Sequence, residues 1–186
     1  MYWRKRFWKK RKININKDIG EISIVSIFLR IFNKSKKENY IIKEKTEQPD
    51  FVCVNGQGEL IAIEIKELFD DHKVISQNIK LRENYKGDDI RCVPGIKRTL
   101  LTRDDVFKIL EKINNTGFKK LNHTVVRYKI GVINIDGAVT VDEIIENICK
   151  NPMDISCFKN INLAFLLYYP HDGSNEWNYL ELKNKL

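Results

Sequence analysis

Residues 47–67 read EQPDFVCVNGQGELIAIEIKE, and they decide the fold because two short β-rich runs flank a cluster of turn residues. Residues 51–54 and 60–65 are rich in apolar and β-branched side chains, which favour strands. Residues 55–58, NGQG, have the composition of a tight turn. The stretch therefore predicts a β-hairpin whose two strands pair antiparallel.

Three polar residues of this hairpin, Asp50, Glu64 and Lys66, lie near one end. Facing residues of an antiparallel pair share a face of the sheet, and so do residues two apart in one strand. A loop of three or five residues, with a glycine in the left-handed conformation, places Asp50 opposite Glu64 and Lys66 on the same face. A two-residue loop would send Asp50 to the other face. The polar residues therefore act together only with an odd-numbered loop of three or five residues, or with a β-bulge, and we expect one of these.

Two carboxylates on one face of a buried strand pair repel each other. At roughly 4 Å and an effective dielectric constant near 20, the repulsion is about 4 kcal/mol. A divalent cation removes this conflict, and otherwise one carboxyl group must take up a proton. Because carboxylate and carbonyl oxygens suit Mg²⁺ or Mn²⁺, we expect one of these ions as cofactor.

Pro49-Asp50, followed by Glu64-Ile65-Lys66 at the end of the next strand, resembles the motif of the PD-(D/E)XK nuclease superfamily. The resemblance implies the restriction-endonuclease-like fold: an α/β protein with a central mixed β-sheet flanked by helices and an αβββαβ core. It further implies a metal-dependent phosphodiesterase. In that enzyme Asp50, Glu64 and the Ile65 carbonyl would hold the metal, and Lys66 would position or activate the attacking water.

The motif covers only the hairpin, and similar triplets occur at Glu181-Leu182-Lys183 and Asp71-His72-Lys73. These two lack a Pro-Asp pair at hairpin distance. The alternative is a surface hairpin in which Asp50 starts a turn and Glu64 and Lys66 form a solvated pair. That alternative explains each residue singly but not their convergence on one end of a hairpin with two apolar faces.

Two further acids, Glu21 and Glu47, are candidates for the same site. Relatives in the superfamily place a catalytic glutamate on the first helix, where Glu21 lies. Glu21 also stands three residues after Asp18, which is the pattern of a capping box at a helix N-terminus. Glu47 precedes the hairpin at the metal end and is either an extra ligand or a solvated acid at the end of a strand.

The rest of the chain supplies helices and strands in the order that the resemblance implies. Apolar periodicity and capping residues predict helices at 18–32, 72–85, 102–115 and 140–149, and strands at 40–47, 125–135, 163–169 and 177–182. Thr102 is the predicted cap of the third helix and Gly117 its end. Both faces of the hairpin are apolar, so we expect helices on both faces of the sheet.

A formal net charge of +8 over 186 residues favours a polyanionic partner, nucleic acid before an acidic membrane. We expect a basic-aromatic N-terminal arm at 1–17 and a single nuclease-like domain at 18–186. The arm can bind nucleic acid, remain a solvated tail or lie on a membrane. The cations expected to contact nucleic acid in the arm are Arg4, Arg6, Lys9 and Lys10. After the hairpin they are Lys73, Lys80, Arg82 and Arg98, each of which also suits an ordinary charged helix face.

Other classes of site find no support in the sequence. The four cysteines and three histidines are scattered without zinc-ligand spacing, so free thiols in a reducing cytoplasm are expected. No run of apolar residues is long enough to span a bilayer.

These observations predict a metal-dependent nuclease that acts on DNA more readily than on RNA. In this superfamily a homodimer is a common means of cutting both strands. Two alternatives remain open: a ribonuclease on the same fold, and a scaffold of this fold that binds nucleic acid or a protein partner without catalysis.

Overall fold

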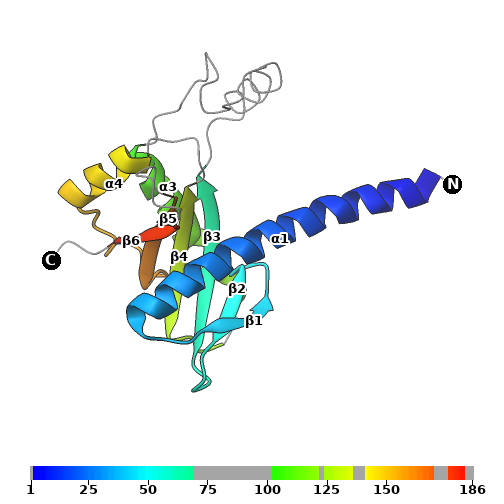
Figure 1. The fold of residues 1–186 in the computed structure, drawn as a ribbon, viewed down its shortest axis with the longest axis horizontal. Helices are drawn as coiled ribbons and strands as arrows, with labels where there is room; N and C mark the ends of the chain where they lie inside the picture. The colour runs from blue at the N-terminus through cyan, green and yellow to red at the C-terminus, as the bar shows by residue number, and fades with distance from the viewer. Residues whose placement is uncertain (1, 69–101, 122–123, 136–140, 170–175, 183–186) are drawn as a thin grey trace, which may run out of the picture.

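The protein is an α/β protein, and in the part of the chain that the structure describes three helices pack on a six-strand mixed sheet (Figure 1). The computed structural model describes residues 2–68, 102–121, 124–135, 141–169 and 176–182, with the backbone alone at 2–18 and 141–143. The described elements are α1 (Tyr2–Lys36), β1 (Ile41–Lys45), β2 (Phe51–Val54), β3 (Leu60–Leu68), α3 (Arg103–Thr116), the 3-10 helix η2 (Lys119–Leu121), β4 (Tyr128–Ile135), α4 (Val141–Lys150), β5 (Leu163–Tyr168) and β6 (Asn178–Leu182).

The strands lie in the sheet in sequence order, from β1 to β6. β1, β2 and β3 are antiparallel neighbours, β3, β4 and β5 are parallel, and β6 returns antiparallel to β5. The two parallel connections carry α3 and α4, as parallel strands require a crossover. This order of elements agrees with the predicted one over the described residues.

Helices cover both faces of the sheet, as the doubly apolar hairpin predicted. On β3 the alternate residues Ile61, Ile63 and Ile65 pack with the buried residues of α1, whereas Ala62 packs with those of α3 and α4. On the α1 face, the ring of Phe165 lies 5.2 Å from that of Phe28. The site residues of β3 therefore alternate between two separate cores.

Helix α1 begins far earlier than the sequence predicted. The chain is helical from Tyr2 through Asp18, so the predicted N-terminal cap at Asp18 is wrong. Figure 1 shows the N-terminal part of α1 extending away from the sheet. The division into an arm and a domain remains a prediction, but the arm is continuous with the helix that covers the sheet.

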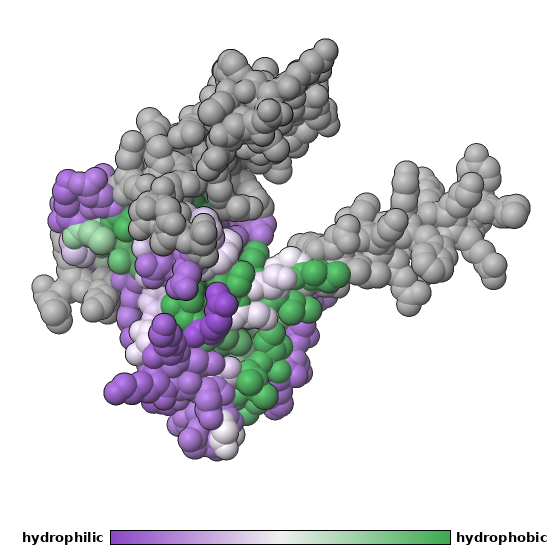
Figure 2. Space-filling model, viewed as in Figure 1, coloured by the Kyte–Doolittle hydropathy of each residue, from purple (hydrophilic) through white to green (hydrophobic). Residues whose placement is uncertain are grey.

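The surface that Figure 2 displays carries hydrophobic residues along α1 and the neighbouring edge of the sheet, between polar regions. Exposed large hydrophobic side chains of the described residues include Ile19 and Ile22 of α1 and Ile41 of β1. No helix in the described part of the chain combines the length and apolar character needed to cross a bilayer.

Helix α3 has the ends that the sequence predicted. The Thr102 side chain caps it by accepting a hydrogen bond from the Asp105 backbone N–H, and the Asp105 carboxylate accepts one from the Thr102 backbone N–H. Gly117 follows its last residue. The predicted helix at 72–85 lies outside the described residues.

The β2–β3 loop is held by Asn55, a turn residue that is 6% exposed. Its Oδ1 accepts hydrogen bonds from the backbone N–H groups of Gln57 and Glu59, at 3.1 and 2.9 Å. Val54 faces Leu60, so five residues, 55–59, connect the strands. Gly58 has a φ of 82°, in the left-handed region that the predicted loop requires.

Because Asn55 satisfies two backbone donors in a buried position, Asn55→Ala is expected to lower the free energy of unfolding by about 2 kcal/mol. Chemical unfolding followed by circular dichroism measures the change. Gln57→Ala is the control, since Gln57 is exposed and its bond to Asn55 uses the backbone. Equal stabilities of the two variants would contradict a role for Asn55 in fixing the loop.

Candidate functional site

The candidate site lies where β2 begins, against the second half of β3. Val54 faces Leu60 and Val52 faces Ala62, which confirms the predicted register. One step further along the hairpin, the backbone N–H of Asp50 donates a hydrogen bond to Glu64 Oε2 at 3.1 Å. The odd-numbered loop thus brings Asp50 to Glu64, as the sequence predicted.

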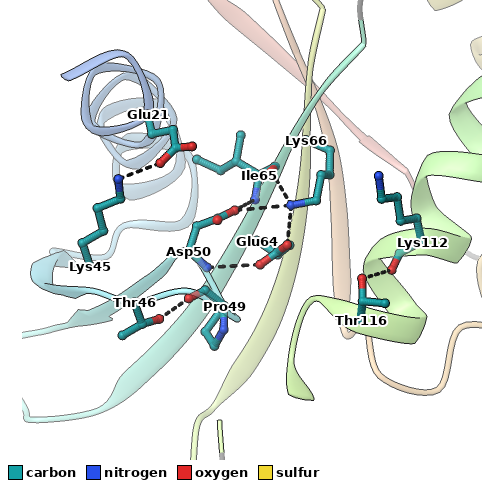
Figure 3. A network of polar contacts seen from close by, with 10 residues as sticks. All are labelled: Glu21, Lys45, Thr46, Pro49, Asp50, Glu64, Ile65, Lys66, Lys112 and Thr116. Carbon is teal, nitrogen blue, oxygen red and sulfur yellow. Dashed lines mark hydrogen bonds and ion pairs between the residues drawn. The ribbon is translucent and has the colours of Figure 1, made fainter. Parts of the chain in front are cut away.

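Three oxygen atoms converge on the ammonium group of Lys66 (Figure 3). Lys66 Nζ donates hydrogen bonds to Glu64 Oε1 and, at 3.1 Å, to the Ile65 carbonyl. Asp50 Oδ2 lies 3.8 Å from the same nitrogen. The structure therefore brings the predicted ligand and catalytic residues together in one cluster.

Backbone N–H groups hold both carboxylates in place. Asp50 Oδ2 accepts a hydrogen bond from the Ile65 N–H at 2.7 Å, and Glu64 Oε2 accepts the bond from Asp50 described above. These bonds cross between the paired strands. The positions of the two acids are consequently fixed by the hairpin rather than by flexible side-chain contacts.

Exposure rises across the cluster from Glu64 to Lys66. The side chains of Glu64, Asp50 and Lys66 are 3%, 16% and 28% exposed. The pKa of Glu64 is raised to about 7, mainly by burial and also by the Asp50 charge, although the hydrogen bond and charge of Lys66 oppose the increase. Near neutral pH, Glu64 is therefore a carboxyl group that needs a cation or a proton.

The donor set suits a magnesium or manganese ion. Its members are two carboxylates and one backbone carbonyl, all oxygen ligands, and they already surround a positive group. Within the described residues, no cluster of three or more His, Cys, Asp or Glu side chains forms a metal site. Such a partial set agrees with Mg²⁺, which commonly takes one or two carboxylates and completes its shell with water and substrate phosphate.

Gly117, which the sequence indicated only as the end of a helix, packs directly on Glu64. A Cβ atom at position 117 would lie 2.7 Å from Glu64 Cγ and 2.8 Å from the Ile113 carbonyl oxygen. Both distances are shorter than real Cβ atoms show. Gly117 thus leaves the space that the Glu64 side chain occupies, and no local sequence signal connects the two residues.

One further cation, Lys112, lies on α3. Figure 3 shows Lys112 and Thr116 on α3, on the side of the sheet from which Lys66 projects. The Thr116 hydroxyl donates to the Lys112 carbonyl at 2.8 Å, within the last turn of the helix. The Lys112 side chain is exposed and lies on α3, on the same side of the sheet as the Lys66 side chain (Figure 3).

The additional acids pair with lysines of their own. Glu21 Oε2 lies 2.8 Å from Lys45 Nζ, where α1 crosses the end of β1. Glu47 forms an ion pair with Lys120, which lowers the pKa of Glu47, and its side chain is 80% exposed. A ligand role for either acid remains a prediction.

The cations expected to contact nucleic acid fall where no side chain is described. Arg4, Arg6, Lys9 and Lys10 lie on α1, whose backbone alone is described there. Lys73, Lys80, Arg82 and Arg98 lie outside the described residues.

Comparisons with known protein families, with curated proteins and with solved structures find no match to this chain.

Proposed function

We propose that the protein is a Mg²⁺- or Mn²⁺-dependent nuclease with a restriction-endonuclease-like fold that hydrolyses phosphodiester bonds, with DNA as the preferred substrate. The observation that carries the proposal is the convergence of Asp50, Glu64 and the Ile65 carbonyl on one cation. The arrangement of α1, three antiparallel strands, α3 and parallel β4 supports it, because it has the order of the αβββαβ core.

The residues have separate roles in this reaction. The metal ion, held by the three oxygens, would polarise a phosphoryl oxygen and lower the pKa of a water molecule. Asp50 and Glu64 supply the negative charge, and their backbone hydrogen bonds keep them in position. The ammonium of Lys66, on the more exposed side, offsets charge at the phosphate or holds the attacking water.

The substrate assignment rests on charge. The net charge of +8 favours a polyanion, and Lys112 adds a cation on the side of the sheet from which Lys66 projects. The three described cysteines are free, which supports the proposed location in a reducing cytoplasm. A homodimer would supply a second site for cutting the second strand.

The test is cleavage of supercoiled plasmid by the purified protein in Mg²⁺ or Mn²⁺. Chelation of the metal should abolish cutting, and Asp50→Asn should slow it by about 10³-fold or more because a metal ligand is lost. Asp104→Asn, an exposed acid on the first turn of α3, is the matched control. Cutting that persists in Asp50→Asn would reject the assignment. Duplex DNA and single-stranded RNA offered in parallel distinguish DNA cleavage from RNA cleavage.

One observation favours a second candidate, a scaffold that binds nucleic acid without catalysis. Lys66 itself neutralises part of the carboxylate charge, so the cluster is compatible with a purely structural role. This candidate predicts salt-sensitive DNA binding, no metal-dependent turnover, and weaker binding after removal of residues 2–12. Gel-shift titrations at two salt concentrations measure it.

A further inference from the structure

The ammonium of Lys66 occupies the place where the three oxygens of the proposed metal site converge. It contacts Glu64 Oε1 and the Ile65 carbonyl and lies 3.8 Å from Asp50 Oδ2. A cation bound by the same atoms would meet this ammonium at close range. Two positive groups cannot share such a small oxygen cluster without strong repulsion.

We propose that Lys66 is an internal competitor for the metal ion: the divalent cation binds only as the Lys66 ammonium turns outward, and a substrate phosphate favours that movement. The inference rests on the proposed nuclease function, because it concerns the regulation of the same site. It makes Lys66 a group with two positions, one on the carboxylates and one on the phosphate.

The structure identifies Lys66 as the member of the cluster that can move. Asp50 and Glu64 each accept a backbone hydrogen bond, and Glu64 is almost fully buried. Lys66 is the most exposed of the three and carries its charge on a flexible four-carbon stem. The oxygens therefore stay in place while the ammonium leaves.

Charge explains why substrate and metal should help each other to bind. The two carboxylates and Lys66 together carry one negative charge when all are ionised. A phosphodiester group beside Lys66 attracts the ammonium, which leaves two negative charges for the metal ion. By linkage, if bound DNA raises the affinity for the metal ion, the bound metal ion raises the affinity for DNA by the same factor.

The experiment measures Mn²⁺ binding at pH 8 from the electron paramagnetic resonance signal of free Mn²⁺. Lys66→Met keeps much of the side-chain volume and removes the charge, so its affinity for Mn²⁺ should rise by about tenfold or more. Lys112→Met, which removes a nearby cation that does not touch the carboxylates, should change the affinity by less than about twofold. Asp50→Asn should abolish binding at this site.

A second arm repeats the titrations at 4 °C with a saturating short DNA duplex, using Asp50→Asn to subtract Mn²⁺ held by the duplex. DNA should tighten Mn²⁺ binding several-fold in the wild-type protein and much less in Lys66→Met. Lys66→Gln, with thermal unfolding as a check on folding, provides an independent neutral variant. General damage to the site would weaken Mn²⁺ binding, which is the opposite of the expected result.

The outcomes separate this inference from the proposed function. Equal Mn²⁺ affinities of the wild type and both neutral variants, with binding lost in Asp50→Asn, overturn the competition but retain the metal site. Absence of Mn²⁺ binding in every protein overturns both.

Discussion

Glu64→Gln is expected to slow phosphodiester cleavage by about 10³-fold or more and, in the absence of metal, to stabilise the fold above pH 7. The activity falls because an amide lacks the charge that holds a metal ion, whose contribution to transition-state stabilisation amounts to several kcal/mol. The stability rises because the amide needs no counter-charge in a position where the side chain is 3% exposed. The same substitution is thus expected to lower the cleavage rate and to raise the stability of the fold.

The sign of the pH effect follows from the raised pKa of Glu64, which is about 7 in the folded protein against an ordinary value of 4.5. Between these two values the folded state binds the proton and the unfolded state does not, so stability decreases as pH rises. The decrease is complete above pH 7 and amounts to about 3 kcal/mol. Glu64→Gln has no proton to lose and should not show this decrease.

Urea unfolding of the wild type and of Glu64→Gln between pH 5 and pH 8, with chelator present, measures the difference. The stability gap between the two proteins should widen across this range in favour of Glu64→Gln. Glu111→Gln, an exposed acid on α3, is the matched control and should follow the wild type. Parallel pH profiles for wild type and Glu64→Gln would show that burial does not raise the pKa of Glu64 in this way.

The hairpin was predictable because its determinants are local. A period of two along each strand and the number of loop residues fix which side chains share a face. Asn55 and Gly58 lie in the loop itself and supply its hydrogen bonds and its left-handed turn. The meeting of Asp50 with Glu64 follows from these residues without reference to the rest of the chain.

The start of α1 was not predictable from the same kind of local signal. A capping box at Asp18 requires a non-helical backbone there, yet the helix runs through this residue from Tyr2. Extending an existing helix is easier than starting one, and residues 2–17 contain neither Pro nor Gly to interrupt it. Glu21 then pairs with Lys45 across the helix–strand contact, instead of with a cap.

Contacts between segments that are distant along the chain could not be predicted from the sequence either. Glu47 pairs with Lys120, and Gly117 packs on Glu64, although neither pair is close along the chain. Such contacts depend on how α3 and η2 lie against the hairpin. The sequence identifies the chemically important residues, and the packing decides which neighbours hold them in position.

Gly117→Ala is expected to slow cleavage by about 100-fold, because a displacement of about 1 Å at a reacting group has an effect of this size. The φ of Gly117 is −64°, which alanine adopts readily, so the effect arises from contact and not from backbone conformation. The added Cβ would lie 2.7 Å from Glu64 Cγ. Glu64 is buried and must therefore move together with its carboxylate. Overpacking should also lower the free energy of unfolding by about 1–3 kcal/mol.

The shorter acid at position 64 tests whether the contact with Glu64 causes this loss. In the double variant Gly117→Ala with Glu64→Asp, one methylene is removed where the new methyl group is added. The two substitutions should therefore be coupled by about 1 kcal/mol or more, with the double variant more stable than the sum of the single changes predicts. Gly20→Ala is the matched control, because nothing lies within 4 Å of its Cβ position and alanine favours a helix. If the two changes in the free energy of unfolding are additive, the destabilisation by Gly117→Ala comes from the contact with the Ile113 carbonyl. Gly117 would then have no role in positioning Glu64.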